Sequence, residues 1–199
     1  MYNIHAIKVQ EFSQQTADNL VDVILMVLLS IQQNWLSVGI QLQDVKENRE
    51  ASKFLWGNKR KAYNYITTNK HFMFGQFKAV LNSKQTDEQK ADALMKIFLR
   101  VPGLGLVKAG FVCQLAAGLV GCIDLHNIRI YSIDEKALKI SSKMSAALQA
   151  EKRKKYITLC HAIGTENLWN NWCNHLATKS DKWRDGNHVS EVHATYIGV

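Results

Sequence analysis

Hydrophobic side chains recur at helical spacing along most of the chain. Within residues 18–35 the apolar positions fall three or four residues apart, which predicts an amphipathic helix capped by Asp18. Residues 48–66 predict a second helical region, interrupted near Gly57-Asn58. No stretch alternates convincingly between apolar and polar residues, so we expect an all-α protein without a sheet of more than two short strands.

A capping box and the single proline bound the helices in the middle of the chain. Thr86 and Gln89 stand three residues apart, as in a capping box, and open a predicted helix that ends before Pro102. A second helix is predicted over 106–117, and Asp124 is placed to cap a short one. The remaining predicted helices, one of them capped by Thr165, occupy residues 133–150, 152–163, 165–178 and 188–196.

The composition fits one folded unit over residues 1–199. The chain is 47% hydrophobic and 21% charged, which excludes a disordered polypeptide. The longest apolar run, residues 23–29, is too short to cross a bilayer, and the N-terminus lacks a basic-then-apolar signal pattern. We therefore expect a soluble, cytoplasmic and monomeric protein with no membrane contact.

The four cysteines show no metal-binding pattern. Residues 113, 122, 160 and 173 include no CxxC pair and no pair with zinc-ligand spacing, and they are too dispersed for an iron–sulfur cluster. The sequence therefore predicts buried free thiols, no metal and no other cofactor.

The formal net charge of +8 favours a polyanionic partner such as DNA. Many basic proteins bind no nucleic acid, so the charge alone does not identify the partner. The basic residues form several clusters rather than a tail, at 59–61, 96–100, 136–143 and 152–155.

Residues 91–117 predict a helix–hairpin–helix motif around the turn Pro102-Gly-Leu-Gly105. Gly103 and Gly105, on either side of Leu104, allow positive φ angles and the close approach of a phosphate. The amides at the N-terminus of the second helix form an anion site with the helix dipole, and Lys108 is available to add charge. Structural helix pairs use similar turns, so this motif by itself is weak evidence for DNA binding.

Three segments together resemble the helix–hairpin–helix DNA glycosylase superfamily, the endonuclease III and adenine glycosylase group. The hairpin Val101-Pro-Gly-Leu-Gly-Leu-Val-Lys-Ala109 is similar to the family's L-P-G-V-G-x-x-x-A segment. Ile123-Asp-Leu-His126 is similar to the context of its catalytic Asp, and Val27-Leu-Leu-Ser-Ile-Gln-Gln33 to its L-L-S-x-Q segment. The matches lie in the family's order within a predicted core, residues 18–131, whereas the helices of 132–199 match nothing.

The resemblance implies a base-flipping DNA N-glycosylase with Asp124 as the catalytic carboxylate. Cleavage of a base–sugar bond builds positive charge on the sugar, which a fixed carboxylate stabilises while it orients water. Gln32 would fill the gap left by the extruded base. His126 and Asn127, which follow the Asp directly, and Trp35 are candidates to line the base pocket, although local hydrogen bonding is an equally good interpretation of the first two.

Lys108 departs from the family's bifunctional pattern. The lysine that attacks the sugar in bifunctional members corresponds to Val107 here, and one residue is about 100° of helix rotation. The resemblance therefore implies an enzyme without lyase activity, which uses water as its nucleophile. The compact chain, without the family's iron–sulfur cysteines, would suit a divergent, phage-encoded member.

Two other functions fit the same sequence. One is a phage enzyme of DNA base hypermodification, a transferase that acts on a modified thymine held in the same fold. The other is a DNA-binding protein that kept the hairpin and lost catalysis, in which Asp124 is only a helix cap. The aromatic residue that stacks on a flipped base would be one of Trp35, Trp56, Tyr63 and Phe72, which all precede the hairpin.

Overall fold

The computed structural model describes residues 4–141, 143–179 and 186–199. Most of the described residues are helical, and none of them is in a strand. The predicted all-α class is thus confirmed. No helix in the described part is both long and apolar enough to cross a membrane.

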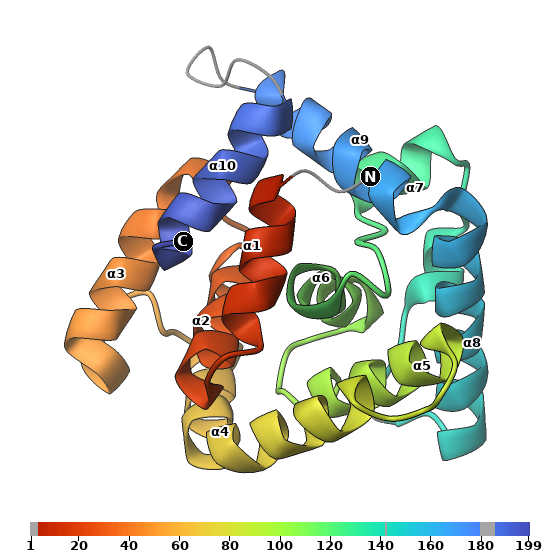
Figure 1. Cartoon of the computed structure of the whole chain (residues 1–199), viewed down its shortest axis with the longest axis horizontal. Helices are drawn as coiled ribbons and strands as arrows, with labels where there is room; N and C mark the ends of the chain where they lie inside the picture. Colours follow the sequence, from red (N-terminus) through yellow and green to blue (C-terminus); the bar gives the residue numbers. More distant parts are fainter. Residues whose placement is uncertain (1–3, 142, 180–185) are drawn as a thin grey trace.

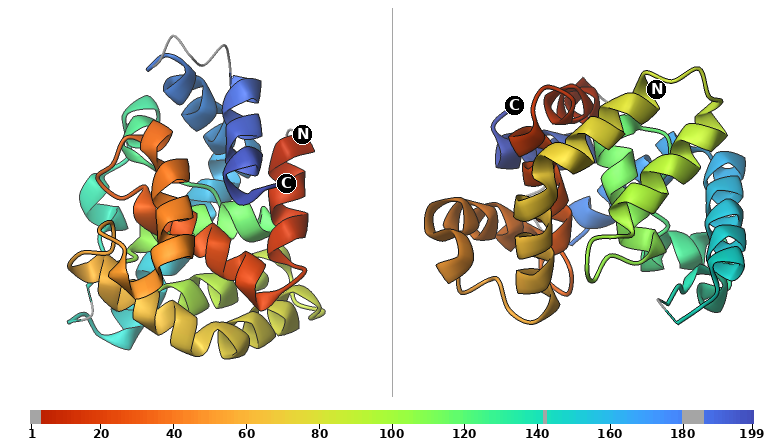
Figure 2. Two further views of the ribbon diagram at one scale, coloured as in Figure 1. Left: turned by 90° about the vertical axis from the view of Figure 1, so that its left-hand side faces the viewer. Right: turned by 90° about the horizontal axis from the view of Figure 1, so that it is seen from below.

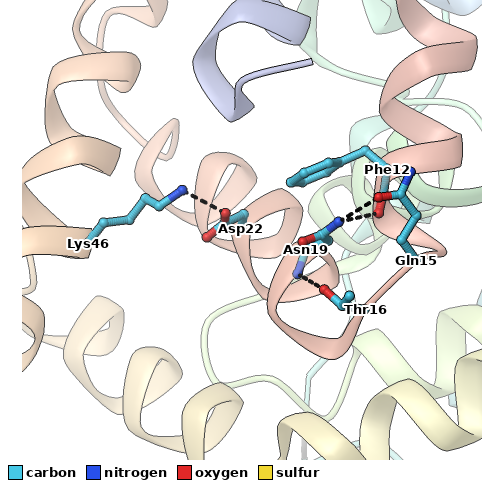
Figure 3. Close-up of polar contacts among 6 residues, drawn as sticks. All are labelled: Phe12, Gln15, Thr16, Asn19, Asp22 and Lys46. Atoms are coloured by element: carbon cyan, nitrogen blue, oxygen red, sulfur yellow. Dashed lines mark hydrogen bonds and ion pairs between the residues drawn. The ribbon is translucent and has the colours of Figure 1, made fainter.

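The first two helices, α1 (Ile4–Ser13) and α2 (Ala17–Leu29), meet at a tight turn. Thr16, not Asp18, caps α2: its hydroxyl accepts the amide of Asn19 at 3.1 Å, while the Asn19 side chain donates to the Phe12 carbonyl (Figure 3). Asp18 instead pairs with Lys70 at 2.6 Å. The helix also ends at Leu29, before the predicted residue 35, and its residues 23–29 are all buried.

The next helices, α3 (Val38–Asn48) and α4 (Asn58–Leu81), flank α2. Lys46 of α3 forms a 2.9 Å ion pair with Asp22 of α2 (Figure 3). Short 3-10 turns, η1 (Trp35–Ser37) and η2 (Arg49–Ala51), precede and follow α3. The predicted interruption at Gly57 is confirmed, since Gly57 has a φ of +55° and precedes α4. The bounds of the helix differ from the predicted 48–66, because α4 begins at Asn58 and continues to Leu81.

The hairpin helices are α5 (Asp87–Phe98) and α6 (Leu106–Ala117). The capping box of Thr86 and Gln89 is confirmed, with the two reciprocal bonds at 3.3 and 3.0 Å. In Figure 1, α6 lies near the middle of the molecule, in contact with α1, α2 and α5. Gly118 ends α6 in the left-handed conformation, with a φ of +68°.

The C-terminal half differs most from the prediction. The helix expected over 133–150 is largely absent: only a 3-10 turn, η3 (Glu135–Leu138), and the start of α8 (Ala146–Ile163) are helical there. Ser145 caps α8, which is why that helix begins so late. The other helices are α7 (Leu125–Ile130), α9 (Thr165–Ala177) and α10 (Gly186–Ile197). Gly164, with a φ of +91°, precedes α9 in place of the predicted Thr165 cap.

Residues 132–199 are integrated with the rest of the molecule. α8 packs against α5 and α9, and α10 packs against α1, α9 and α3. Both views of Figure 2 keep α10 beside α1, so the first and last helices pack together. The segments that resemble the glycosylases are therefore supported by helices outside that resemblance.

Candidate functional site

The turn of the hairpin has one glycine that requires a positive φ. Gly103 has a φ of +85°, whereas Gly105 has an extended conformation with a φ of −90° and a ψ of −177°. The expectation that both glycines adopt positive φ is therefore corrected. Leu104 is only 5% exposed, and its amide donates to the Val101 carbonyl at 3.1 Å, so it anchors the turn in the core and does not face a ligand.

Lys108 points toward the end of α2. It lies in the first turn of α6, which Gly105 precedes without a side-chain cap. Its Nζ donates to the Ser30 hydroxyl at 3.2 Å and lies 5.6 Å from the ring centroid of Phe111. The side chain is half-buried, and its role as a phosphate contact stays a prediction.

A second lysine, Lys59, shares this location and was not identified from the sequence. It is 5% exposed, and its Nζ donates to the Leu29 carbonyl at 3.1 Å. Burial lowers the pKa of Lys59, and the nearby charge of Lys108 lowers it further. No acidic group among the described residues forms an ion pair with either lysine. The negative end of the α2 dipole partly compensates the two charges.

Asp124 caps α7, as predicted. One carboxylate oxygen accepts the Asn127 amide at 2.9 Å, and within the described residues the carboxylate forms no ion pair. Two residues earlier, burial raises the pKa of the Cys122 thiol, while Lys108 lowers it and Asp124 raises it. Both charges therefore act on the same buried thiol. Lys108 joins the hairpin helix to the end of α2, and Asp124 stands at the start of α7, two residues after Cys122.

Buried side chains from two other helices fix the backbone that leads to Asp124. The Tyr156 hydroxyl, on α8, donates to the Gly121 carbonyl at 2.8 Å and accepts the Ile123 amide at 3.1 Å. The Gln114 side chain, on α6, accepts the Cys122 amide at 2.9 Å. These two residues were also missed from the sequence, where nothing distinguishes them from other core residues. The carboxylate of Asp124 is thereby presented on a rigid support.

A histidine pair lies beside Asp124. His126 of α7 stacks on His175 of α9, with ring centroids 3.9 Å apart and an angle of 19° between the planes. Burial lowers the pKa of His175, and His126 and Lys179 lower it further, whereas Asp124 raises it. The predicted residue His126 is therefore at the site, together with a partner from the C-terminal region that the resemblance does not cover.

Two predicted pocket residues are structural instead. Asn127 is fully buried, and its side-chain amide donates to the carbonyls of Cys122 and Leu168 at 3.0 and 3.2 Å, so it joins α7 to α9. Trp35 is 5% exposed and packs edge-on against Trp172, with ring centroids 5.1 Å apart. Neither side chain is free to contact a flipped base, because each is enclosed by the core.

Gln32 is exposed at the end of α2 and has a φ of +56°. Few residues other than glycine adopt this conformation, and such strain is most frequent at functional sites. The predicted wedge residue is thus at the surface, two residues from the serine that Lys108 contacts.

No family model matches the chain, and neither does any curated protein or solved structure. In the part of the chain that the structure describes, no three His, Cys, Asp or Glu side chains are placed to share a metal ion. All four cysteines are buried thiols, as predicted.

Proposed function

We propose that the protein is a DNA N-glycosylase-like enzyme that extrudes one nucleotide and cleaves its base–sugar bond. The observation that carries this proposal is the contact between the hairpin helix and the end of α2, two segments that are far apart in the sequence. Lys108 contacts Ser30 at the end of α2, and Lys108 and Asp124 both act on the Cys122 thiol. Two ammonium groups and the strained Gln32 therefore lie at the end of α2, and Asp124 caps α7 two residues after Cys122.

Each group has a role in this reaction. The carboxylate of Asp124 stabilises the positive charge that develops on the deoxyribose and orients the attacking water. The hairpin amides and Lys108 hold the phosphate backbone, while Gln32 enters the duplex where the nucleotide leaves it. These contacts offset the few kcal/mol that unstacking a base costs.

The position of Lys108 supports a reaction without lyase activity. Its Nζ donates to the Ser30 hydroxyl at 3.2 Å. Among the described residues, no carboxylate pairs with this ammonium group to accept its proton. Under borohydride, wild-type protein and Lys108→Gln should both form no trapped adduct with DNA. An adduct that depends on Lys108 would instead identify a lyase.

The decisive experiment replaces Asp124 with Asn and measures release of bases from duplexes that carry damaged, mispaired or modified nucleotides. Asn can still cap a helix, so folding and DNA affinity should be retained. The charge is lost, and the rate should fall roughly a thousandfold or more. Asp134→Asn is the matched control, because Asp134 also caps a short helix, η3, through a 2.9 Å bond.

An Asp124→Asn variant as active as wild type would return Asp124 to a capping role and leave a non-catalytic DNA-binding protein. A wild-type protein that releases no base from any duplex would also contradict the proposal.

One observation favours a second candidate, the phage transferase of base hypermodification. Lys59 and Lys108 lack acidic partners among the described residues, and adjacent cations of this kind accommodate an anionic group on a modified base or its donor. Such an enzyme would alter the nucleoside and release no base. Mass spectrometry of nucleosides after incubation with modified DNA and amine donors distinguishes the two reactions.

A further inference from the structure

A basic cavity lies at the start of α4, outside the group of residues around Asp124. Its volume is about 490 Å³, and its walls include the side chains of Lys53, Trp56, Arg60, Lys61 and Asn64. No acidic residue lines it. None of the three basic side chains forms an ion pair with any residue in the described ranges. The cavity thus concentrates positive charge that the protein itself does not neutralise.

Trp56 is the aromatic wall of this cavity. Its side chain is 53% exposed, whereas the other tryptophans with described side chains, Trp35, Trp169 and Trp172, are buried. Packing in the hydrophobic core therefore does not explain why a tryptophan stands at position 56. Of the four aromatic residues named from the sequence as candidates for stacking, Trp35 and Tyr63 are buried, and only Trp56 is both exposed and part of a basic cavity.

The walls of the cavity are held in place by the backbone. The Trp56 carbonyl accepts the Lys59 amide at 3.0 Å, and Gly57 turns the chain into α4. The Nε of Arg60 donates to the Leu55 carbonyl at 2.8 Å, which fixes one edge of the guanidinium and leaves its terminal nitrogens for a ligand. A fixed aromatic face beside a fixed guanidinium is suited to a base and its phosphate.

The segment that carries the cavity lies next to the hairpin and includes one lysine of the pair. Asn58 packs so close to Gly103 that a Cβ on that glycine would lie 3.4 Å from the Asn58 Cβ. Lys59, whose Nζ bonds the end of α2, also lies over the Trp56 ring, 5.5 Å from its centroid. The cavity is therefore within reach of a strand bound at the hairpin.

We propose that this cavity is a second nucleic-acid site, in which one base of a single strand stacks on Trp56 while its phosphates contact Arg60 and Lys61. The proposal rests on the proposed function for DNA as the substrate, and it adds a contact away from the reacting sugar. Stacking on an aromatic face tolerates any base, so the site would hold the strand without reading its sequence.

The test measures binding of a short, fluorescein-labelled single-stranded oligothymidylate by fluorescence anisotropy at several salt concentrations, with quenching of the tryptophan fluorescence as a second readout. Trp56→Ala should weaken binding roughly tenfold, because the base loses the aromatic face on which it stacks. Trp56→Phe should bind more tightly than Trp56→Ala while losing most of the fluorescence quenching. Lys61→Gln should reduce the salt slope by about 0.7, the loss of one phosphate contact on a single strand.

Two variants on or just after α4, at positions that do not line the cavity, serve as controls. Phe72→Ala removes another exposed aromatic side chain of α4, and Lys84→Gln removes an exposed charge beyond the far end of that helix. An α4 of 24 residues is about 36 Å long, so Lys84 is distant from the cavity. Both controls should bind as wild type does.

The outcomes separate this proposal from the proposed function. If Trp56→Ala binds as tightly as wild type, or if polyglutamate quenches Trp56 as the oligonucleotide does, the strand site is rejected. If Asp124→Asn is fully active but Trp56→Ala loses affinity, the reaction mechanism fails and the strand site stands. If Asp124→Asn is inactive and Trp56→Ala is normal in binding, only the strand site fails.

Discussion

Gly103 and Gly105 stand two residues apart in one turn, yet only the first needs to be glycine. The φ of +85° at Gly103 belongs to the left-handed region, in which a side chain costs about 1–2 kcal/mol. Gly105 has an ordinary extended conformation, and a Cβ there would meet no atom within 4 Å. Gly105 is therefore replaceable without strain.

Gly103→Ala should lower the free energy of unfolding by about 1–2 kcal/mol and weaken DNA binding on every sequence, because the hairpin amides are displaced. Gly105→Ala should leave the free energy of unfolding nearly unchanged, since the weaker cap is offset by the reduced entropy of the unfolded chain. Urea unfolding and DNA titration measure both quantities. Equal effects of the two substitutions would contradict this assignment of the turn.

At the same scale, His175 makes stability depend on pH. Burial lowers its pKa, with His126, Lys179 and Arg129 acting in the same direction against Asp124. The unfolded chain then binds more protons than the folded protein between the lowered pKa and about 6.5. The free energy of unfolding is therefore undiminished by His175 above that window, and it falls as the pH is lowered through the window.

His175→Gln should therefore show a smaller loss of stability than wild type when the pH is lowered from about 7.5 to about 5.5. The measurement is the urea midpoint at each pH for both proteins. The same loss in both would mean that protonation of His175 is not coupled to folding.

At the scale of elements, an ion pair joins the first hairpin helix to α8. Arg153 of α8 donates its Nε to Asp92 of α5 at 2.8 Å, and its side chain is 8% exposed. Lys96 bonds the other carboxylate oxygen at 2.6 Å from a more exposed position. Burial alone would raise the pKa of Asp92, but these two cations outweigh it and lower the pKa. α8 thus supports both α5 and, through Tyr156, the segment before Asp124.

Arg153→Met should lower the free energy of unfolding by about 1–3 kcal/mol, because it leaves a partly buried carboxylate with one partner fewer. Lys96→Met, at the exposed side of the same carboxylate, should change it by about 0.5 kcal/mol or less. Urea unfolding near neutral pH compares the two variants. A larger effect of Lys96→Met would show that the exposed pair, not the link to α8, holds α5.

At the scale of the whole molecule, Tyr196 ties the C-terminal helix to the centre. Its hydroxyl donates to the Trp35 carbonyl at 3.2 Å, and the two ring centroids are 5.9 Å apart. The ring also approaches α3 so closely that a Cβ on Gly39 would lie 2.6 Å from it. α10 therefore closes the molecule over α1 and α3 (Figure 1).

Tyr196→Ala should lower the free energy of unfolding by about 2–3 kcal/mol, since a half-buried ring and its hydrogen bond are lost together. Tyr196→Phe should cost only about 1 kcal/mol, because the ring remains. Thermal unfolding followed by tryptophan fluorescence measures both. If the alanine variant is as stable as wild type, α10 does not contribute to the folded core.

The sequence by itself determined those features that depend on neighbours within a few residues. The capping box at Thr86, the helix end before Pro102, the interruption at Gly57 and the cap at Asp124 all involve atoms that the local chain brings together. Weakly patterned segments were missed: α1 and α3 were not predicted, and neither was the extension of α4 beyond residue 66.

Only the tertiary structure decided which side chains share the candidate site. Lys59 and Lys108 meet at the end of α2, and His126 meets His175, across gaps in the sequence of about fifty residues that no local pattern spans. Burial likewise assigned Asn127 and Trp35 to the core and left Trp56 exposed, although the sequence does not distinguish them. The physical reason is that desolvation and the proximity of charges depend on what the rest of the chain packs against each residue.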